Sequence, residues 1–355
     1  MILVSILGDF HSSVLPVSFE FKEDITKHVI IYDDARQDTK ASWKVLRGQQ
    51  AFLEKLPENS TFKYELVPMQ VDEDNYESIV SRFEDIKVLA EEKEDIYLNS
   101  TDGLSSIAVI LSSKLLGIGA KVISYDRFSN TYNLHTYQAM KKCPMQSKMD
   151  ILTHITLKGY TIVKKSSKNE IASRQTVIKN LTKDLPRYHN FLEQLLNDKT
   201  IMDEVKGYDD YKQLLREINK ENDLQFIKKG VFNEYIYHLL VENFDFDDVW
   251  VNIRIRASKN VESDFDVVMI KDNHFHTIDC EIIQHSNGQK QIYRMETIID
   301  YLDDDGKSMI LSIGRTGKQF KDADISRALY GDIKIYKEDN FDEKAFLKDI
   351  SQWFL

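Results

Sequence analysis

The segment from Phe265 to Ile283 is the part of the sequence that most restricts how the chain can fold. It reads FDVVMI-KDN-HFHTIDCEII, with two runs rich in Val, Ile, Phe and Thr around a short polar stretch. This composition predicts two strands joined by a tight turn. If the loop consists of Asp272 and Asn273, Lys271 pairs with His274, and the register of the whole hairpin follows.

In that register, four acidic residues gather on one face. Asp266 lies opposite Asp279 and Asp264 lies opposite Glu281, because side chains alternate between faces along a strand. Directly opposed Cβ atoms are roughly 5 Å apart, so like charges there destabilise a sheet unless a cation compensates them. The apolar neighbours in TIDCEII indicate a buried strand, where isolated acids are rare. The hairpin therefore predicts a divalent metal site, with a solvated acidic face as the alternative.

Length and composition predict a chain of two domains. The 355 residues are 42% hydrophobic and 30% charged, which is ordinary for a globular protein. Two cysteines, Cys143 and Cys280, are too few for a disulfide framework and fit the reducing cytoplasm. Without an apolar stretch of membrane-spanning length or a signal peptide, we expect a cytoplasmic protein with no membrane partner. The net charge of −11 argues against non-specific coating of nucleic acid.

Residues 1–145 alternate between strand-like and helix-like segments. The strand-like runs are Met1–Leu7, His28–Tyr32, Phe62–Val71, Asp95–Asn99, Lys121–Tyr125 and Asn130–His135, and the helix-like runs are Ala41–Leu56, Asn75–Glu91 and Gly103–Leu116. This order predicts a Rossmann-like α/β domain with a mostly parallel sheet and helices on both faces. Ligands of such sheets bind beyond the carboxyl ends of the strands.

Small polar loops follow two of these strands, GDFHSS after the first and STDGLSS after DIYLN. Hydroxyl residues and Gly at a helix N-terminus expose backbone N–H groups that suit phosphate, or they cap the helix. Neither GxGxxG nor a P-loop motif is present. The candidate ligand-binding residues are Gly8, Asp9, His11, Ser12, Thr101, Asp102, Gly103, Leu104, Ser105 and Ser106.

The segment NSTDGLSS at the start of a helix resembles the ligand loop of the CRISPR-associated Rossmann fold (CARF) family. The resemblance implies a homodimer that binds a cyclic oligoadenylate, with cyclic tetra-adenylate as the expected activator. Asp102 replaces the first Gly of the family pattern, and Ser105 lies near its usual Lys. These departures leave open the ring size of the ligand and whether the domain degrades it.

Residues 146–215 are expected to form a small helical, winged-helix-like connector, and residues 216–355 a second α/β domain. In the second domain a helix carrying Glu234 precedes the strand VWVNIRIR and the acidic hairpin. Arg254 and Arg256 on that strand either bind a substrate backbone or neutralise the carboxylates. The helix Gln289–Leu302, the strand Lys307–Ser312, the helix Ala323–Tyr330, the strand Asp332–Tyr336 and a C-terminal helix follow.

This order resembles the PD-(D/E)xK restriction-endonuclease-like fold, and nearly the whole chain resembles the CARF nucleases of type III CRISPR antiviral defence. The resemblance implies catalytic and metal-binding roles for Asp266, Asp279, Glu281 and Glu234, which would hold Mg²⁺ or Mn²⁺. Glu281 stands where Lys is usual, and it can ligate a metal or accept a proton but cannot donate.

The implied function is a metal-dependent endonuclease that a cyclic oligoadenylate activates and that cleaves phosphodiesters of DNA, RNA or both, as single strands or a nicked duplex. A catalytically degenerate ligand sensor and a ligand-independent restriction-type endonuclease are the alternatives. Gln284, His285 and Lys290 follow the hairpin and either replace the missing Lys or lie on the surface.

Overall fold

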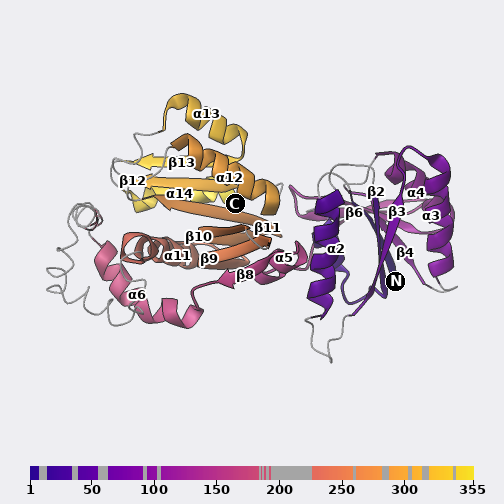
Figure 1. Cartoon of the computed structure of the whole chain (residues 1–355), viewed down its shortest axis with the longest axis horizontal. Helices are drawn as coiled ribbons and strands as arrows, with labels where there is room; N and C mark the ends of the chain where they lie inside the picture. Colours follow the sequence, from indigo (N-terminus) through magenta and orange to yellow (C-terminus); the bar gives the residue numbers. More distant parts are fainter. Residues whose placement is uncertain are drawn as a thin grey trace. The chain divides into compact units, whose positions relative to one another are not determined.

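A computed structural model divides the chain into two compact units, Met1–Thr161 and Ile162–Leu355 (Figure 1). The structure describes residues 1–7, 14–33, 39–54, 63–90, 94–101, 105–183, 185, 188, 192, 226–258, 261–281, 288–302, 306–313, 320–338 and 341–355. Each unit is an α/β sandwich built on its own sheet, as the sequence predicts.

The sheet of the first unit has the order β3-β2-β1-β4-β5-β6-β7. Its strands are β1 (Ile2–Ile6), β2 (Lys27–Asp33), β3 (Glu65–Val71), β4 (Ile96–Asn99), β5 (Lys121–Asp126), β6 (Thr131–His135) and β7 (Met140–Pro144). Strands β3, β2, β1, β4 and β5 are parallel, and β6 and β7 add antiparallel to the edge. The expected mostly parallel sheet is confirmed.

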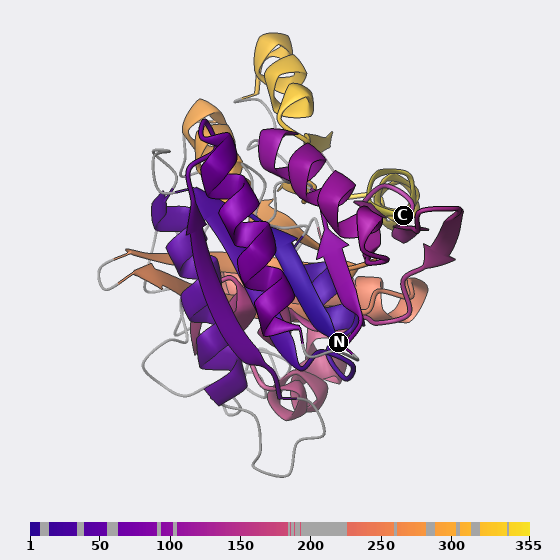
Figure 2. The ribbon, with the colours of Figure 1, turned by 90° about the vertical axis from the view of Figure 1, so that its right-hand side faces the viewer.

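Helices cover both faces of this sheet because its central strands are apolar on both sides. Every residue of β1 is buried, which is typical of a central parallel strand. The helices of the unit are α1 (Val14–Glu20), α2 (Thr39–Glu54), α3 (Tyr76–Leu89), α4 (Ser105–Gly117) and α5 (Ile151–Leu157). Figure 2 shows α3 and α4 side by side over one face, and α2 covers the other (Figure 1).

The direction of the chain across the sheet reverses between β1 and β4. Strand β1 pairs with β2 on one side and with β4 on the other, and Ser5 lies beside Asn99. The carboxyl ends of these two strands are thus adjacent at the topological switch point, where open α/β sheets bind their ligands.

The sheet of the second unit has the order β13-β12-β11-β10-β9-β8. Its strands are β8 (Thr161–Lys164), β9 (Asp248–Ser258), β10 (Val261–Lys271), β11 (His274–Glu281), β12 (Ser308–Ile313) and β13 (Ile333–Glu338). The helices are α6 (Lys168–Thr182), α11 (Val231–Asn243), α12 (Gly288–Leu302), α13 (Asp322–Tyr330) and α14 (Glu343–Phe354). A π-helical turn, Phe226–Gly230, leads directly into α11.

The predicted hairpin register is confirmed in the ladder between β10 and β11. Lys271 pairs with His274, and the pairs continue to Val267 and Ile278. Asp272 and Asn273 have φ angles of 52° and 67°, the left-handed values that a two-residue type I′ loop requires. Turn and strand pattern therefore agree on one register.

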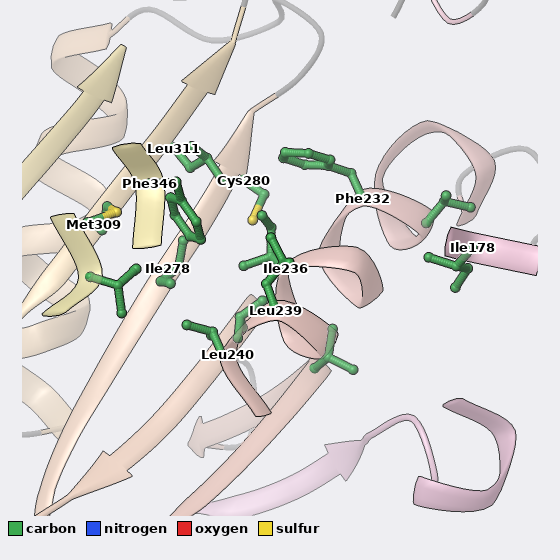
Figure 3. Close-up of a cluster of buried hydrophobic side chains, with 14 of the residues drawn as sticks. Ile178, Phe232, Ile236, Leu239, Leu240, Ile278, Cys280, Met309, Leu311 and Phe346 are labelled. Atoms are coloured by element: carbon green, nitrogen blue, oxygen red, sulfur yellow. The ribbon is translucent and has the colours of Figure 1, made fainter. Parts of the chain in front are cut away.

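The two faces of this sheet carry different helices. Ile278 and Cys280 of β11 pack against Phe232 and Ile236 of α11 in the main core, and α14 contributes Phe346 (Figure 3). Helices α12 and α13 pack on the opposite face in a second apolar cluster. Because side chains alternate, Asp279 points away from the α11 core.

Two elements of the first unit were not predicted, helix α1 and strand β7. After residue 146 the chain forms helix α5, a turn at Gly159 with φ 79°, and strand β8. Helix α5 packs on α2 in the first unit, whereas β8 joins the second sheet. The three-part division of the chain stays a prediction. Within the described ranges, no helix has the length and apolar character needed to cross a membrane.

Candidate active site

Two buried carboxylates meet a lysine in the second unit. Asp266 on β10 and Asp279 on β11 are 6% and 3% exposed. The Lys229 Nζ lies 2.8 Å from Oδ2 of Asp266 and 3.4 Å from Oδ1 of Asp279. Because Lys229 belongs to the π-helical turn before α11, three separate elements converge here. We call Asp266, Asp279 and Lys229 the acidic centre.

Amide groups fix the orientation of both carboxylates. Asn233 Nδ2 donates to Oδ1 of Asp266 at 3.0 Å, and the backbone N–H of Cys280 donates to Oδ2 at 2.8 Å. Gln291 Nε2 on α12 donates to Oδ2 of Asp279 at 2.9 Å. Helices from both sides of the sheet therefore hold the pair in place.

These two amide side chains leave their oxygen atoms without a hydrogen bond. In the part of the chain that the structure describes, no donor reaches the buried Oδ1 of Asn233 or Oε1 of Gln291. Buried acceptors are normally satisfied by protein, water or an ion. Oxygen ligands suit Mg²⁺ and Mn²⁺, and Mg²⁺ commonly uses one or two carboxylates with waters and substrate phosphates. The chemistry of the residues present therefore fits such an ion.

The two neighbouring carboxylates have different pKa values. Burial, with the repulsion from Asp279, raises the pKa of Asp266 to about 8 against the attraction of Lys229. Burial also acts to raise the pKa of Asp279, but Lys229 and the hydrogen bond with Asp266 outweigh it and hold that pKa below its ordinary value. One ammonium group thus faces two acids, of which Asp279 is the more acidic.

Glu281 lies next to the acidic centre. It ends β11, two residues after Asp279, and burial raises its pKa to about 7 while Lys229 opposes the shift. Among the described residues, no three His, Cys, Asp or Glu side chains form a group arranged to hold a metal. The structure thus brings two carboxylates to a common point, and a ligand role for Glu281 stays a prediction.

The predicted helix acid Glu234 is engaged elsewhere. Its carboxylate is fully buried and accepts two hydrogen bonds from Arg174 on α6, one of them from Nε at 3.1 Å. Arg174 also stacks over the ring of Phe226, with 4.9 Å from its Cζ to the ring centroid. Burial raises the pKa of Glu234 against the effect of Arg174. These contacts support a structural role for Glu234.

The prediction of four converging carboxylates is wrong at Asp264. This side chain is 61% exposed and pairs with Arg254 Nε at 2.6 Å, so it does not join Asp266 and Asp279. Arg256 pairs with Glu262 in the same way. Of the two roles predicted for these arginines, the structure supports neutralisation of strand carboxylates.

A cleft of about 700 Å³ opens beside the acidic centre. Its wall includes Lys229, Asn233 and Asp266, together with Lys164 of β8 and Arg294 of α12. Arg294 donates to the backbone oxygen of Asp264 at 2.9 Å. Exposed cations on the wall of a cleft favour a negatively charged ligand.

The predicted ligand loops of the first unit lie mostly outside the described residues. Only Thr101 and Ser106 are described with their side chains, and Ser105 is described as the first residue of α4. The Thr101 hydroxyl donates to Oδ1 of Asn99 at 2.6 Å and accepts from the backbone N–H of Tyr125 at 2.8 Å. The other predicted ligand-binding residues lie outside the described ranges; they are Gly8, Asp9, His11, Ser12, Asp102, Gly103 and Leu104.

The sequence pattern missed the cation of the acidic centre. Lys290, one predicted substitute for the missing lysine, is exposed, and Gln284 and His285 lie outside the described residues. Lys229 instead comes from 50 positions before Asp279. Its sequence context, KKG before an apolar helix, indicates only a helix start.

The part of the chain that contains the acidic centre is similar to a known protein family. Residues 220–354 match the sequence model of the family described as Card1-like, endonuclease domain. Within the second unit, these residues are therefore similar to a Card1-like endonuclease domain. No curated protein sequence matches the chain.

Solved structures match nearly the full length. Can2 from Sulfobacillus thermosulfidooxidans in complex with cyclic tetra-adenylate is 15% identical, with a TM-score of 0.69, and the match covers 100% of this chain and 99% of that chain. Protein VC1899 from Vibrio cholerae is 15% identical, with a TM-score of 0.73 and coverages of 99% and 97%.

A type III CRISPR defence DNA nuclease activated by cyclic oligoadenylate is 9% identical to this chain, with a TM-score of 0.53. That match covers 88% of this chain and 45% of that chain. At these identities the three likenesses show a shared two-unit α/β fold.

Proposed function

We propose that the chain is a metal-dependent endonuclease of type III CRISPR defence that a cyclic oligoadenylate activates. The observation that carries the proposal is the acidic centre, which lies beside a cation-lined cleft within the segment that matches an endonuclease family. Two carboxylates that share one ammonium group repel each other, which makes them weak structural partners. A divalent metal ion between them relieves this repulsion and supplies the chemistry of phosphodiester cleavage.

Asp266 and Asp279 are the residues that would hold Mg²⁺ or Mn²⁺, with Glu281 as a further candidate. When bound, the ion activates water and stabilises the charge that develops on the phosphate. Asn233 and Gln291 keep the carboxylates oriented through the hydrogen bonds described above. Glu234 is assigned to the support of α11, because Arg174 occupies both of its oxygen atoms.

The substrate of the cleft is a nucleic-acid backbone. Lys164 and Arg294 supply positive charge on its wall, although the chain as a whole has a net charge of −11. Local cations of this kind attract phosphates in any sequence context. DNA and RNA, as single strands or a nicked duplex, are therefore the substrates to compare.

The first unit is assigned the sensor role. Its strand order puts the ends of β1 and β4 side by side, and the two predicted phosphate-binding loops follow these strands. The full-length likeness to Can2 in complex with cyclic tetra-adenylate supports the same class of ligand. We expect a homodimer, with activation through unequal ligand affinity for two conformations.

The test is a cleavage assay with labelled single-stranded RNA, single-stranded DNA and plasmid, with Mn²⁺ or Mg²⁺. Each reaction is run with and without cyclic tri-, tetra- and hexa-adenylate. We expect cleavage that requires a metal and one of the rings and that Asp279→Ala abolishes. Cleavage that no ring changes would contradict the sensor role.

A catalytically inactive sensor is the second candidate, because Glu281 occupies the position of the family lysine. This candidate predicts tight binding of a cyclic oligoadenylate without cleavage of any substrate. The same assay, together with calorimetric titration of the three rings, separates the two functions.

A further inference from the structure

The lysine of the acidic centre occupies a distinctive place between the acids and the cleft. The ammonium nitrogen of Lys229 lies 2.8 Å from a carboxylate oxygen of Asp266 and 3.4 Å from one of Asp279, and its side chain is 36% exposed. Lys229 also lines the cleft that the proposed function assigns to the substrate backbone. The ammonium group of Lys229 therefore lies where the two carboxylates meet the cleft.

The strand position that would normally supply this charge carries the opposite one. Glu281 follows Asp279 by two residues, so both side chains belong to the same face of β11. A carboxylate at that position cannot donate a hydrogen bond to water or to phosphate. Lys229 lies close enough to Glu281 for the two charges to attract each other.

We propose that Lys229 is the catalytic lysine of this endonuclease and that the π-helical turn, rather than strand β11, delivers its ammonium group. The proposal rests on the proposed function. In the reaction, the oxygen of a water molecule forms a new bond to phosphorus, and the P–O ester bond breaks. Solvent takes the proton of that water and supplies one to the departing oxygen. Lys229 keeps its proton, orients the water and stabilises the charge on the phosphate.

The position of Lys229 depends on close packing within the turn. A Cβ added at Gly230 would lie 2.3 Å from Cδ2 of Phe226, so only glycine fits beside this ring. Arg174 lies over the same ring and holds Glu234, one turn further along α11. Arg174 thereby contacts both Phe226 and Glu234, the residues on either side of Lys229 in this segment. Single π-helical turns of this kind are frequent at functional sites.

The first test compares Lys229→Met with the matched control Lys168→Met, whose parent side chain is 75% exposed on α6. We expect kcat for the metal- and ring-dependent cleavage to fall roughly 10²- to 10⁴-fold in Lys229→Met, as for loss of a group that handles charge or protons. KM should change little. The Mn²⁺ affinity measured by calorimetry should be equal or higher, because the ammonium group no longer competes for the two carboxylates.

The outcomes separate this proposal from the one on which it rests. Lys229→Met with cleavage within threefold of the wild type overturns the role of Lys229 alone. A loss of Mn²⁺ affinity in Lys229→Met equal to that in Asp279→Ala overturns it as well, since Lys229 would then only maintain the metal site. A wild-type protein that cleaves no substrate with any metal and ring overturns both proposals.

Chemical restoration of the amine gives a test that does not depend on folding of the methionine variant. Lys229→Cys is made in a Cys143→Ser background, since Cys280 is only 1% exposed and shielded from reagent. Alkylation with 2-bromoethylamine, verified by mass, rebuilds an amine of nearly lysine length at position 229. We expect cleavage to return after this treatment and not after iodoacetamide. No return with the amine, or equal return with both reagents, overturns the proposal.

Discussion

Among the described residues of the second unit, the Arg174–Glu234 pair and the acidic centre differ in how completely their buried carboxylates are satisfied. In the Arg174–Glu234 pair, one guanidinium group binds both oxygens of one carboxylate. In the acidic centre, one ammonium group faces two carboxylates, and neighbouring amide oxygens have no hydrogen bond within the described residues. A satisfied pair fixes structure, whereas two buried carboxylates that share one ammonium group leave a place for a metal ion and a substrate.

The largest effect is expected from breaking the satisfied pair. Arg174→Met leaves Glu234 buried without its partner, which should lower the free energy of unfolding of the second unit by about 3–5 kcal/mol. Urea unfolding followed by tryptophan fluorescence reports this unit, since two of the three tryptophans, Trp250 and Trp353, lie in it.

Arg174→Met/Glu234→Met is the matched control for that loss. Replacement of a whole buried pair by apolar residues is often close to neutral. The double variant should therefore recover most of the stability that the single variant loses. Equal losses in the two variants would contradict the description of this pair as structural.

The acidic centre should instead make the free energy of unfolding of the second unit depend on pH. The folded pKa of Asp266 is about 8, above its ordinary 3.8, so the folded state binds more protons between these values. Its contribution is fully present below pH 3.8 and is lost as the pH rises through 8. The metal-free second unit should lose up to roughly 1.4 kcal/mol per pH unit from this group.

Asp266→Asn removes the titrating group and should flatten that slope. Urea unfolding of both proteins in the presence of a chelator, from pH 5 to pH 8.5, measures the difference. Parallel curves for the wild type and the variant would show that Asp266 is not held protonated by its surroundings.

The smallest of these effects is expected at the turn that links the two pairs. Gly230→Ala forces Phe226 or the backbone to shift, which should cost roughly 1–3 kcal/mol. Displacement of Lys229 should reduce cleavage roughly 10- to 100-fold, the range for a misplacement on the order of 1 Å. Gly117→Ala is the control, because its added Cβ has nothing within 4 Å. Equal cleavage by both alanine variants would show that the packing of the π-helical turn does not affect catalysis.

The hairpin was predictable because its information is local. The alternation of apolar residues and the Asp272-Asn273 turn specify the same register, and the structure has it. Sequence also paired Asp266 with Asp279, and the two residues do meet at Lys229. The same reasoning failed at Asp264, because a neighbouring strand supplies Arg254 to it.

The partners of the buried acids were not predictable, because they depend on long-range packing. Lys229 is 50 residues from Asp279, and Arg174 is 60 residues from Glu234. An isolated Lys or Arg in a helical segment has no periodicity that marks it as buried. Helix α1 and strand β7 were missed for a related reason, since both are short and their ends carry no strong turn signal.

The comparison of Asp279→Asn with Glu234→Gln in the cleavage assay tests most directly which buried acid belongs to the nuclease centre. Both changes remove one charge with almost no change in side-chain volume. We predict that Asp279→Asn abolishes ring- and metal-dependent cleavage in a protein that remains folded, whereas Glu234→Gln lowers stability and retains cleavage per folded molecule. Full cleavage by Asp279→Asn, or loss of cleavage by a folded Glu234→Gln, would contradict the assignment of the acidic centre.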